Sequence, residues 1–88
     1  QQADAFVALP GGYGTLEELF EMLSWSQLGF HAKPVGLLDD SAYFHHLLAF
    51  LDIAVEQQFL RPQHRALLLA ERDPETLLDL LQAAMPSP

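Results

Sequence analysis

The chain has 88 residues, of which 50% are hydrophobic, 12 are Asp or Glu and 4 are Lys or Arg, so the formal net charge is −8. This excess of acid argues against nucleic acid or an anionic membrane as a partner, because both attract clustered basic side chains. The chain has no cysteine, no apolar run near the roughly 20 residues of a membrane span and no basic, apolar start at residues 1–4, so we expect a soluble, cytoplasmic protein without disulfides or Cys-ligated zinc.

The first predicted elements are a strand over residues 5–9 and a helix over residues 15–28. The strand is a continuous apolar run that stops at a Pro-Gly-Gly sequence, which is typical of a strand covered on both faces. The helix carries apolar residues at the spacing i, i+3, i+4 and i+7. Thr15 is its expected N-cap and forms a capping box with Glu18, and Gly29 is its expected stop.

The same alternation continues to the end of the chain. Further strands are predicted over residues 34–38 and 66–70, and further helices over residues 41–59 and 74–85. Residues 39–41, Asp-Asp-Ser, are interpreted as a loop and helix N-cap. The order β-α-β-α-β-α predicts an α/β fold in which helices flank a parallel sheet, with right-handed crossovers. Three strands are few for such a sheet, so we expect the chain to be the C-terminal half of a larger domain.

A glycine-rich segment, residues 10–18, follows the first strand and opens the first helix. In open α/β sheets ligands bind here, beyond the carboxyl ends of the strands. Glycines let the backbone approach a ligand closely, and the free amides and dipole of a helix start suit a phosphate. The Thr15 hydroxyl can add a donor. No basic residue precedes Lys33, so a phosphate here would depend on backbone amides or on basic groups elsewhere in the full protein.

The glycine-rich segment differs from two common phosphate-binding motifs. It lacks the Gly-Lys-Ser/Thr of a P-loop and the third glycine of G-x-G-x-x-G, while a tight turn without a ligand is the simple alternative. Glu17 and Glu18 point about 100° apart on a helix, so only one of them is expected to face a ligand. That carboxylate could accept hydrogen bonds from a ribose, polarise a water or stabilise positive charge. Interaction with the helix dipole is the simpler role for either glutamate.

Residues 10–18 match the PGGxGTxxE motif of the Lonely Guy (LOG) family, whose members carry an old label as lysine decarboxylases. The resemblance covers nearly the whole chain, through residues 3–6, 25–29, 33–38, 59–62 and Arg65. It implies a Rossmann-like nucleotide-binding domain, a homodimer and a cytokinin riboside 5′-monophosphate phosphoribohydrolase. Such an enzyme hydrolyses the N-glycosidic bond of an N6-modified adenosine 5′-monophosphate to the free base and ribose 5-phosphate.

The resemblance also implies roles for individual residues. Gly11, Gly12, Gly14 and Thr15 would hold the 5′-phosphate, and Glu18 would be the catalytic carboxylate. Cleavage of a glycosidic bond passes through an oxocarbenium-like transition state, which a fixed carboxylate stabilises. The resemblance therefore implies neither a metal nor another cofactor.

The family pairs its glutamate with an arginine of a Met-x-x-Arg-Lys motif, which would lie just upstream of residues 3–6. Within residues 1–88 all basic side chains come later, namely Lys33, Arg61, Arg65 and Arg72. We therefore expect these 88 residues alone to carry half of an active site and to be inactive.

Several other residues have simple structural interpretations. His45 and His46 are adjacent and have no partner His at i+4, so we interpret them as surface residues rather than metal ligands. Trp25 is expected to pack in the core or against a second subunit. The broad apolar surface of residues 41–59 is consistent with burial between the sheet and that subunit. Arg65 could reach a substrate, or have a surface or capping role.

Two other functions stay open at this point. A broader nucleoside 5′-monophosphate nucleosidase would share the glycine-rich segment. A non-enzymatic nucleotide- or cofactor-binding carrier would share the fold, as the molybdenum-cofactor carrier proteins that resemble this group do. Glu18 favours an enzyme over a carrier.

Overall fold

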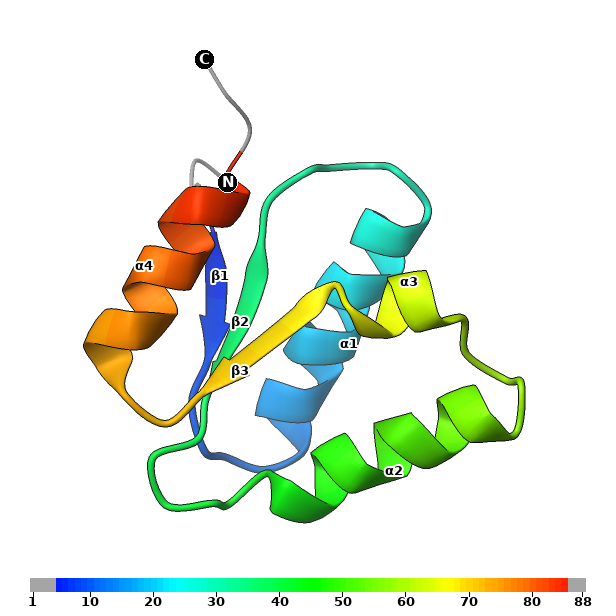
Figure 1. The fold of residues 1–88 in the computed structure, drawn as a ribbon, viewed down its shortest axis with the longest axis horizontal. Helices are drawn as coiled ribbons and strands as arrows, with labels where there is room; N and C mark the ends of the chain where they lie inside the picture. Colours follow the sequence, from blue (N-terminus) through cyan, green and yellow to red (C-terminus); the bar gives the residue numbers. More distant parts are fainter. Residues whose placement is uncertain (1–4, 86–88) are drawn as a thin grey trace.

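The computed structural model describes residues 5–85, in which strands and helices alternate along the chain (Figure 1). Residues 1–4, which open the family-matched segment, lie outside the described residues. No helix within residues 5–85 has the length and apolar character needed to cross a bilayer. The elements are β1 (Phe6–Ala8), α1 (Tyr13–Gln27), β2 (Val35–Leu38), α2 (His45–Glu56), α3 (Pro62–Arg65), β3 (Leu68–Glu71) and α4 (Pro74–Ala84).

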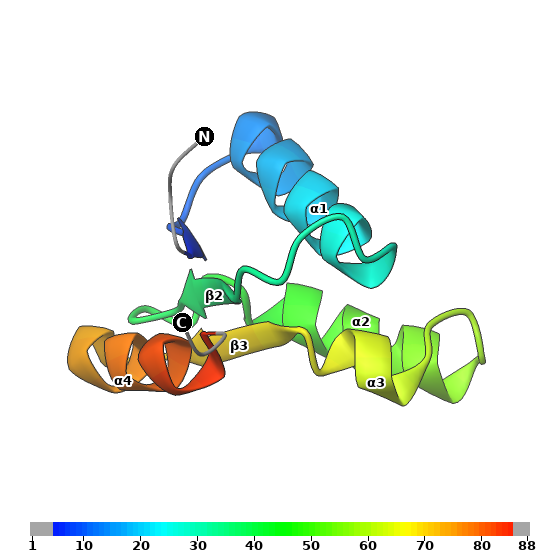
Figure 2. The same ribbon diagram turned by 90° about the horizontal axis from the view of Figure 1, so that it is seen from above.

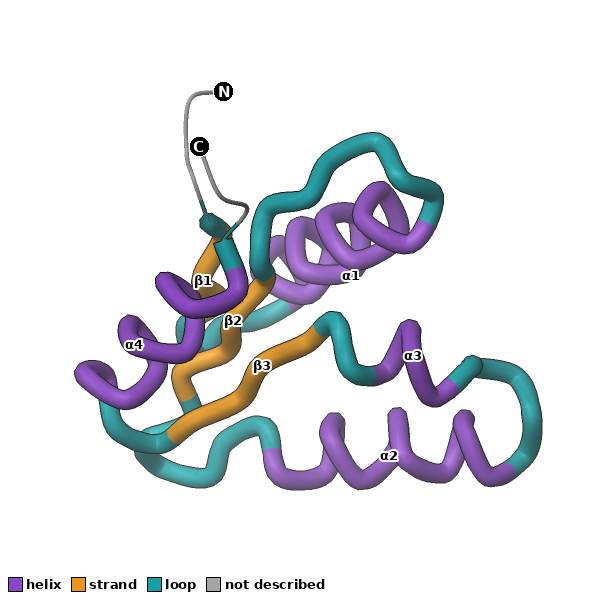
Figure 3. Tube along the Cα trace, turned by 45° about the horizontal axis from the view of Figure 1, so that its top comes forward, coloured by secondary structure: helices purple, strands orange, loops and turns teal. Residues whose placement is uncertain are grey.

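The three strands form one parallel sheet in the order β1-β2-β3, which confirms the predicted α/β class. In this register Val35 of β2 lies opposite Phe6 of β1 on one side and Leu68 of β3 on the other. Because the strands are parallel, their carboxyl ends meet at one edge of the sheet, toward the bottom of Figure 1. Figure 3 shows the strands and the loops that connect them to the helices, and a hydrogen bond from Tyr43 to Gly11 joins the loops that follow β1 and β2.

Helices cover both faces of the sheet, with α1 and α2 on one side and α4 on the other (Figure 2). Successive side chains of a strand point to opposite faces. Val35 and Leu37 accordingly belong to the core on the α1 side, whereas Gly36 faces α4. A Cβ atom on Gly36 would lie 3.1 Å from a methyl carbon of both Leu77 and Leu81. The missing side chain therefore lets α4 pack closely against the middle strand.

Helix α1 begins two residues earlier than predicted, because Gly12 rather than Thr15 is its N-cap. No side chain accepts a capping hydrogen bond at this end, so the predicted capping box of Thr15 and Glu18 is wrong. Thr15 instead lies inside the first turn of the helix. The predicted stop is confirmed, since Gly29 adopts a φ of 84° immediately after the helix.

Helix α2 begins later than predicted, at His45 instead of residue 41. The chain first makes a turn in which Ala42 has a φ of 59°. The Oδ1 atom of Asp39 accepts a hydrogen bond from the Phe44 amide at 2.8 Å, and Asp39 is only 8% exposed. The predicted loop over residues 39–41 is confirmed, but the predicted N-cap is wrong, because Phe44 is the N-cap of α2 and the Asp39 side chain orders the turn before it.

The third strand is also displaced from its predicted range, because the short helix α3 occupies the chain before it. Ala66 is the C-cap of α3, so β3 starts only at Leu68. Helix α4 matches its prediction, with the Asp73 side chain as N-cap. The Thr76 amide and hydroxyl both donate to an Asp73 carboxylate oxygen at 2.9 Å, and these bonds lower the pKa of Asp73.

Candidate functional site

The glycine loop, defined here as residues 10–14, joins β1 to α1 at the carboxyl edge of the sheet. The first bond of the helix runs from the Leu16 amide to the Gly12 carbonyl oxygen at 3.1 Å. The amides of Gly12, Gly14 and Thr15 precede this bond, and none has a hydrogen-bond partner among residues 5–85. The loop thus presents open donors at the positive end of a 15-residue helix.

The glycines of the loop differ in their surroundings. A Cβ atom on Gly11 would collide with the Oγ1 atom of Thr15 and lie 3.1 Å from its Cβ atom. At Gly12 and Gly14 an added Cβ atom would meet nothing within 4 Å. Packing within the chain therefore favours glycine at position 11, because a larger residue would displace the Thr15 side chain, but places no such demand on positions 12 and 14. At those two positions the missing side chain leaves the backbone accessible from outside.

Two of the predicted site residues follow each other on one face of α1. Thr15 is half-buried beside Gly11, and Glu18 is exposed one turn further along. Residues three apart share a helix face, whereas the neighbouring Glu17 points about 100° away. Because Cα–Cβ bonds tilt toward the helix N-terminus, Glu18 leans back over the turn that holds Thr15. The fold thus brings the open amides, the hydroxyl and one carboxylate to one end of α1.

A hydrogen bond between Tyr43 and the glycine loop is a contact that sequence reasoning missed. The Tyr43 hydroxyl donates a hydrogen bond to the carbonyl oxygen of Gly11, with an O···O distance of 2.6 Å. Tyr43 lies in the turn after β2, 32 residues further along the chain. Its ring packs edge-on against Phe44, with centroids 5.0 Å apart. No periodicity or motif links these positions, and only the pairing of β1 with β2 brings their loops together.

The basic side chains lie elsewhere. Lys33, Arg61 and Arg65 precede the amino ends of β2 and β3, at the edge of the sheet opposite the glycine loop. Arg72 follows β3, and β2 separates this strand from β1. The Nε atom of Arg65 lies 2.8 Å from an Asp52 carboxylate oxygen, and this ion pair gives Arg65 a structural role between α3 and α2.

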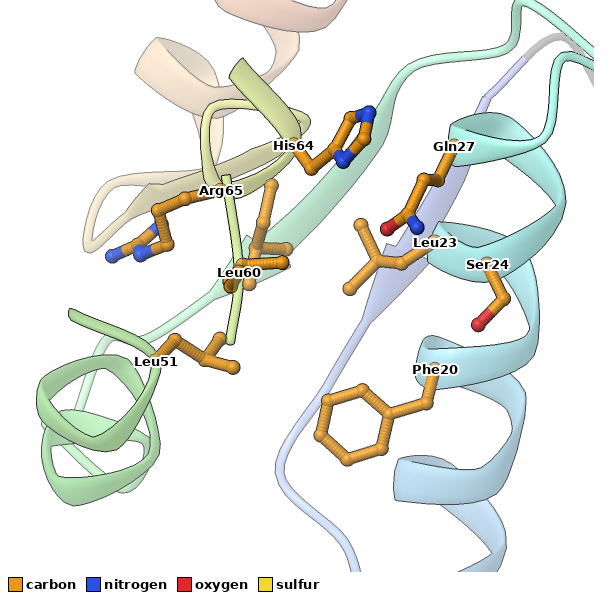
Figure 4. Close-up of a pocket in the computed structure, with 9 residues that line it drawn as sticks. Phe20, Leu23, Ser24, Gln27, Leu51, Leu60, His64 and Arg65 are labelled. Atoms are coloured by element: carbon orange, nitrogen blue, oxygen red, sulfur yellow. The ribbon is translucent and has the colours of Figure 1, made fainter. Parts of the chain in front are cut away.

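The cavity drawn in Figure 4 does not coincide with the glycine loop. It has a volume of about 150 Å³ and lies between α1 and the α2–α3 segment. Its lining is mainly apolar and includes none of the residues predicted to bind phosphate or to act as the catalytic carboxylate. The lining consists of Phe20, Leu23, Ser24, Gln27, Leu51, Leu60, His64, Arg65 and Leu68.

The two adjacent histidines lie at the start of α2. His45 and His46 are exposed, and their rings stack edge-on with centroids 5.1 Å apart. Among residues 5–85 there is no group of three or more His, Asp or Glu side chains placed to hold a metal ion.

Residues 1–81 match the family model described as possible lysine decarboxylase. The chain belongs to this family. A probable cytokinin riboside 5′-monophosphate phosphoribohydrolase of Oryza sativa subsp. japonica, LOGL6, is 52% identical over 86 residues, which are 98% of this chain and 34% of that protein. The cytokinin riboside 5′-monophosphate phosphoribohydrolase LOG7 of Arabidopsis thaliana is 49% identical over 86 residues, which are 98% of this chain and 40% of that protein.

These matches confirm the resemblance to the LOG family. The chain spans about a third to two fifths of the length of these curated relatives. The range matched by the family model includes the glycine loop, helix α1 and the turn that holds Tyr43. All parts of the carboxyl edge described above therefore lie inside the LOG-family region.

Proposed function

We propose that the complete protein containing this chain hydrolyses the N-glycosidic bond of N6-modified adenosine 5′-monophosphates. The products would be the free base and ribose 5-phosphate. The observation that carries the proposal is the glycine loop, where open amides adjoin two glycines whose missing side chains are not required by packing. The relatives named as cytokinin riboside 5′-monophosphate phosphoribohydrolases support the choice of substrate class.

In this proposal Gly11, Gly12, Gly14 and Thr15 hold the 5′-phosphate. The amides at the helix start donate to the phosphate oxygens, and the helix dipole favours the negative charge. The glycine backbone at positions 12 and 14 permits close approach, while Gly11 leaves room for the Thr15 side chain. Within residues 5–85 no Lys or Arg follows β1 or β2 at the carboxyl edge, so the donors that this part of the protein supplies would be backbone amides and the Thr15 hydroxyl.

We assign the catalytic carboxylate to Glu18. A phosphate anchored at the helix start places the attached ribose over the next turn, where Glu18 leans toward the loop. Positive charge develops on the ribose as the glycosidic bond breaks, and a carboxylate in that position stabilises it or activates the attacking water. The ribose would separate the carboxylate from the phosphate and so limit their repulsion.

We further propose that residues 1–88 are the C-terminal portion of one Rossmann-like domain. The relatives are more than twice as long as the matched region, which supports this view. Strand β1 pairs only with β2 within residues 5–85, and Val7 on β1 is 38% exposed. Strands of parallel sheets are normally covered on both faces. The preceding half would supply the arginine that pairs with Glu18, so the 88 residues alone would not turn over substrate.

A homodimer is also part of the proposal. Large apolar side chains are exposed on the α1 and α2 side of the molecule. Exposed apolar patches of this kind commonly mark a surface that binds another protein chain. The exposed side chains include Trp25, Leu28, Phe30, Phe50, Ile53 and Phe59. Light scattering on the complete protein would give twice the monomer mass if two copies bury these side chains against each other.

The direct test compares two substrates of the complete protein. Free base released from isopentenyladenosine 5′-monophosphate is followed beside base released from AMP, and the unphosphorylated nucleoside is the control. Faster release from the N6-modified nucleotide, with little from the nucleoside, is the expected result. Equal rates with AMP would favour the broader nucleosidase, and no base from either nucleotide would favour a carrier.

The substitution Gly14→Ala is expected to weaken substrate binding without destabilising helix α1. Gly14 lies inside α1, an added Cβ atom there meets nothing within 4 Å, and alanine favours a helix over glycine by up to about 1 kcal/mol. We expect urea unfolding to show equal or greater stability, while KM for the nucleotide rises about tenfold because the phosphate loses close approach. Ser24→Ala, on the exposed surface of the same helix, should leave KM unchanged. A stabilised Gly14→Ala variant with normal KM would contradict the phosphate role.

A further inference from the structure

The peptide group between Gly11 and Gly12 is the least constrained unit of the glycine loop. Neither flanking residue has a Cβ atom to restrict rotation, so two opposite orientations of this peptide are sterically accessible. In a trans peptide the C=O and N–H bonds point in opposite directions. A rotation of the peptide would therefore exchange an outward N–H for an outward C=O, and a carbonyl oxygen repels phosphate.

The structure holds this peptide in one orientation through Tyr43. The Tyr43 hydroxyl donates to the Gly11 carbonyl oxygen at 2.6 Å, on the side away from the Gly12 N–H. No other hydrogen bond to this carbonyl comes from residues 5–85. The side chain that bonds to this peptide thus comes from a different loop.

Tyr43 is itself held by the core of the molecule. Its ring packs edge-on against Phe44, which is 2% exposed and belongs to the main hydrophobic cluster. The Phe44 amide is bonded to the Asp39 carboxylate, and the Asp39 amide donates to the Glu71 carbonyl oxygen at 2.8 Å. These contacts run from the end of the sheet to the hydroxyl. The donor is therefore anchored on β2 and β3, although Tyr43 itself is 56% exposed.

We propose that Tyr43 is a positioning residue, which keeps the Gly11–Gly12 peptide in the orientation that presents the Gly12 N–H to the substrate phosphate. A hydrogen bond to the carbonyl also polarises the peptide and strengthens its N–H as a donor. This inference rests on the proposed phosphate site. It adds a residue outside the glycine-rich motif that governs how well the motif binds phosphate.

Tyr43→Phe in the complete protein tests the proposal, because it removes the hydroxyl and keeps the ring. We expect the Kd for ribose 5-phosphate, measured by calorimetry, and KM for the nucleotide to rise about three- to tenfold, the usual effect of one hydrogen bond. We expect kcat to change less than about twofold, because Tyr43 does not act on the glycosidic bond. Ser41→Ala removes a hydroxyl from the same exposed turn and should change neither constant.

The outcomes separate this inference from the proposed function. If the wild-type protein binds ribose 5-phosphate and releases base while Tyr43→Phe has the same Kd and KM, the positioning role is overturned and the proposed function stands. A lower melting temperature with unchanged Kd would also overturn it, since it would show a purely structural contact. A wild-type protein that neither binds ribose 5-phosphate nor releases base would overturn the proposed function, and the positioning role with it.

Discussion

Glu18→Gln in the complete protein is expected to lower kcat for N6-modified adenosine monophosphates about 10³-fold while the protein stays folded. Glutamine keeps the size of the side chain but removes the charge that would stabilise the oxocarbenium-like transition state. Glu18 is exposed and makes no hydrogen bond or ion pair within residues 5–85, so its replacement removes no contact of the fold. Steady-state release of free base measures the loss, and circular dichroism checks the fold.

Glu17→Gln is the matched control, because it removes the same charge from the neighbouring position on another side of the helix. We expect this variant to keep kcat within about twofold of the wild type. Both variants should bind ribose 5-phosphate at least as tightly as the wild type, since each loses a negative charge near the loop. A Glu18→Gln enzyme with normal kcat, or equal losses in both variants, would contradict the role assigned to Glu18.

The second large effect is expected for Gly11→Ala, which adds a single methyl group to the loop. The new Cβ atom would overlap the Thr15 Oγ1 atom, so either the Thr15 side chain rotates away or the loop backbone shifts. Both responses disturb phosphate donors at once. We expect the Kd for ribose 5-phosphate to rise about 100-fold, as expected for the loss of roughly 3 kcal/mol of charge-assisted hydrogen bonding.

Gly36→Ala provides the control for this experiment. Its added Cβ atom would press on methyl carbons of Leu77 and Leu81 on the opposite face of the sheet, at 3.1 Å. Chemical denaturation should show a lower free energy of unfolding for Gly36→Ala, whereas its Kd for ribose 5-phosphate should stay close to that of the wild type. Similar Kd values for the Gly11→Ala and Gly36→Ala variants would argue against a phosphate site at the loop.

The features that the sequence predicted well are those encoded locally. Apolar runs predicted the three strands, and helical spacing predicted α1, α2 and α4, because each pattern is carried by neighbouring residues. The chain order of these elements was enough to predict a parallel sheet. The glycine-rich motif placed the candidate site residues at the N-terminal end of α1, where the structure has them. The roles of these residues in binding and catalysis remain predictions.

The features that sequence reasoning missed depend on contacts between distant residues or on the backbone alone. Gly12 rather than Thr15 is the N-cap of α1, and the side chain of Asp39 orders the turn before α2. Helix α3 has only four residues, which are too few to show the apolar spacing that identifies a helix in a sequence. The bond between Tyr43 and Gly11 joins two loops that only the paired strands bring together.

Asp39 joins the interior of the molecule to its carboxyl edge, since its amide extends the pairing of β2 with β3 and its carboxylate orders the turn that holds Tyr43. Asp39 is buried, and its loss would leave the buried Phe44 amide without a partner. The geometry of the glycine loop is thereby coupled to the cooperative unit that includes the sheet. On heating, this end of the molecule should have no melting transition of its own, and it should lose its shape only when the core unfolds.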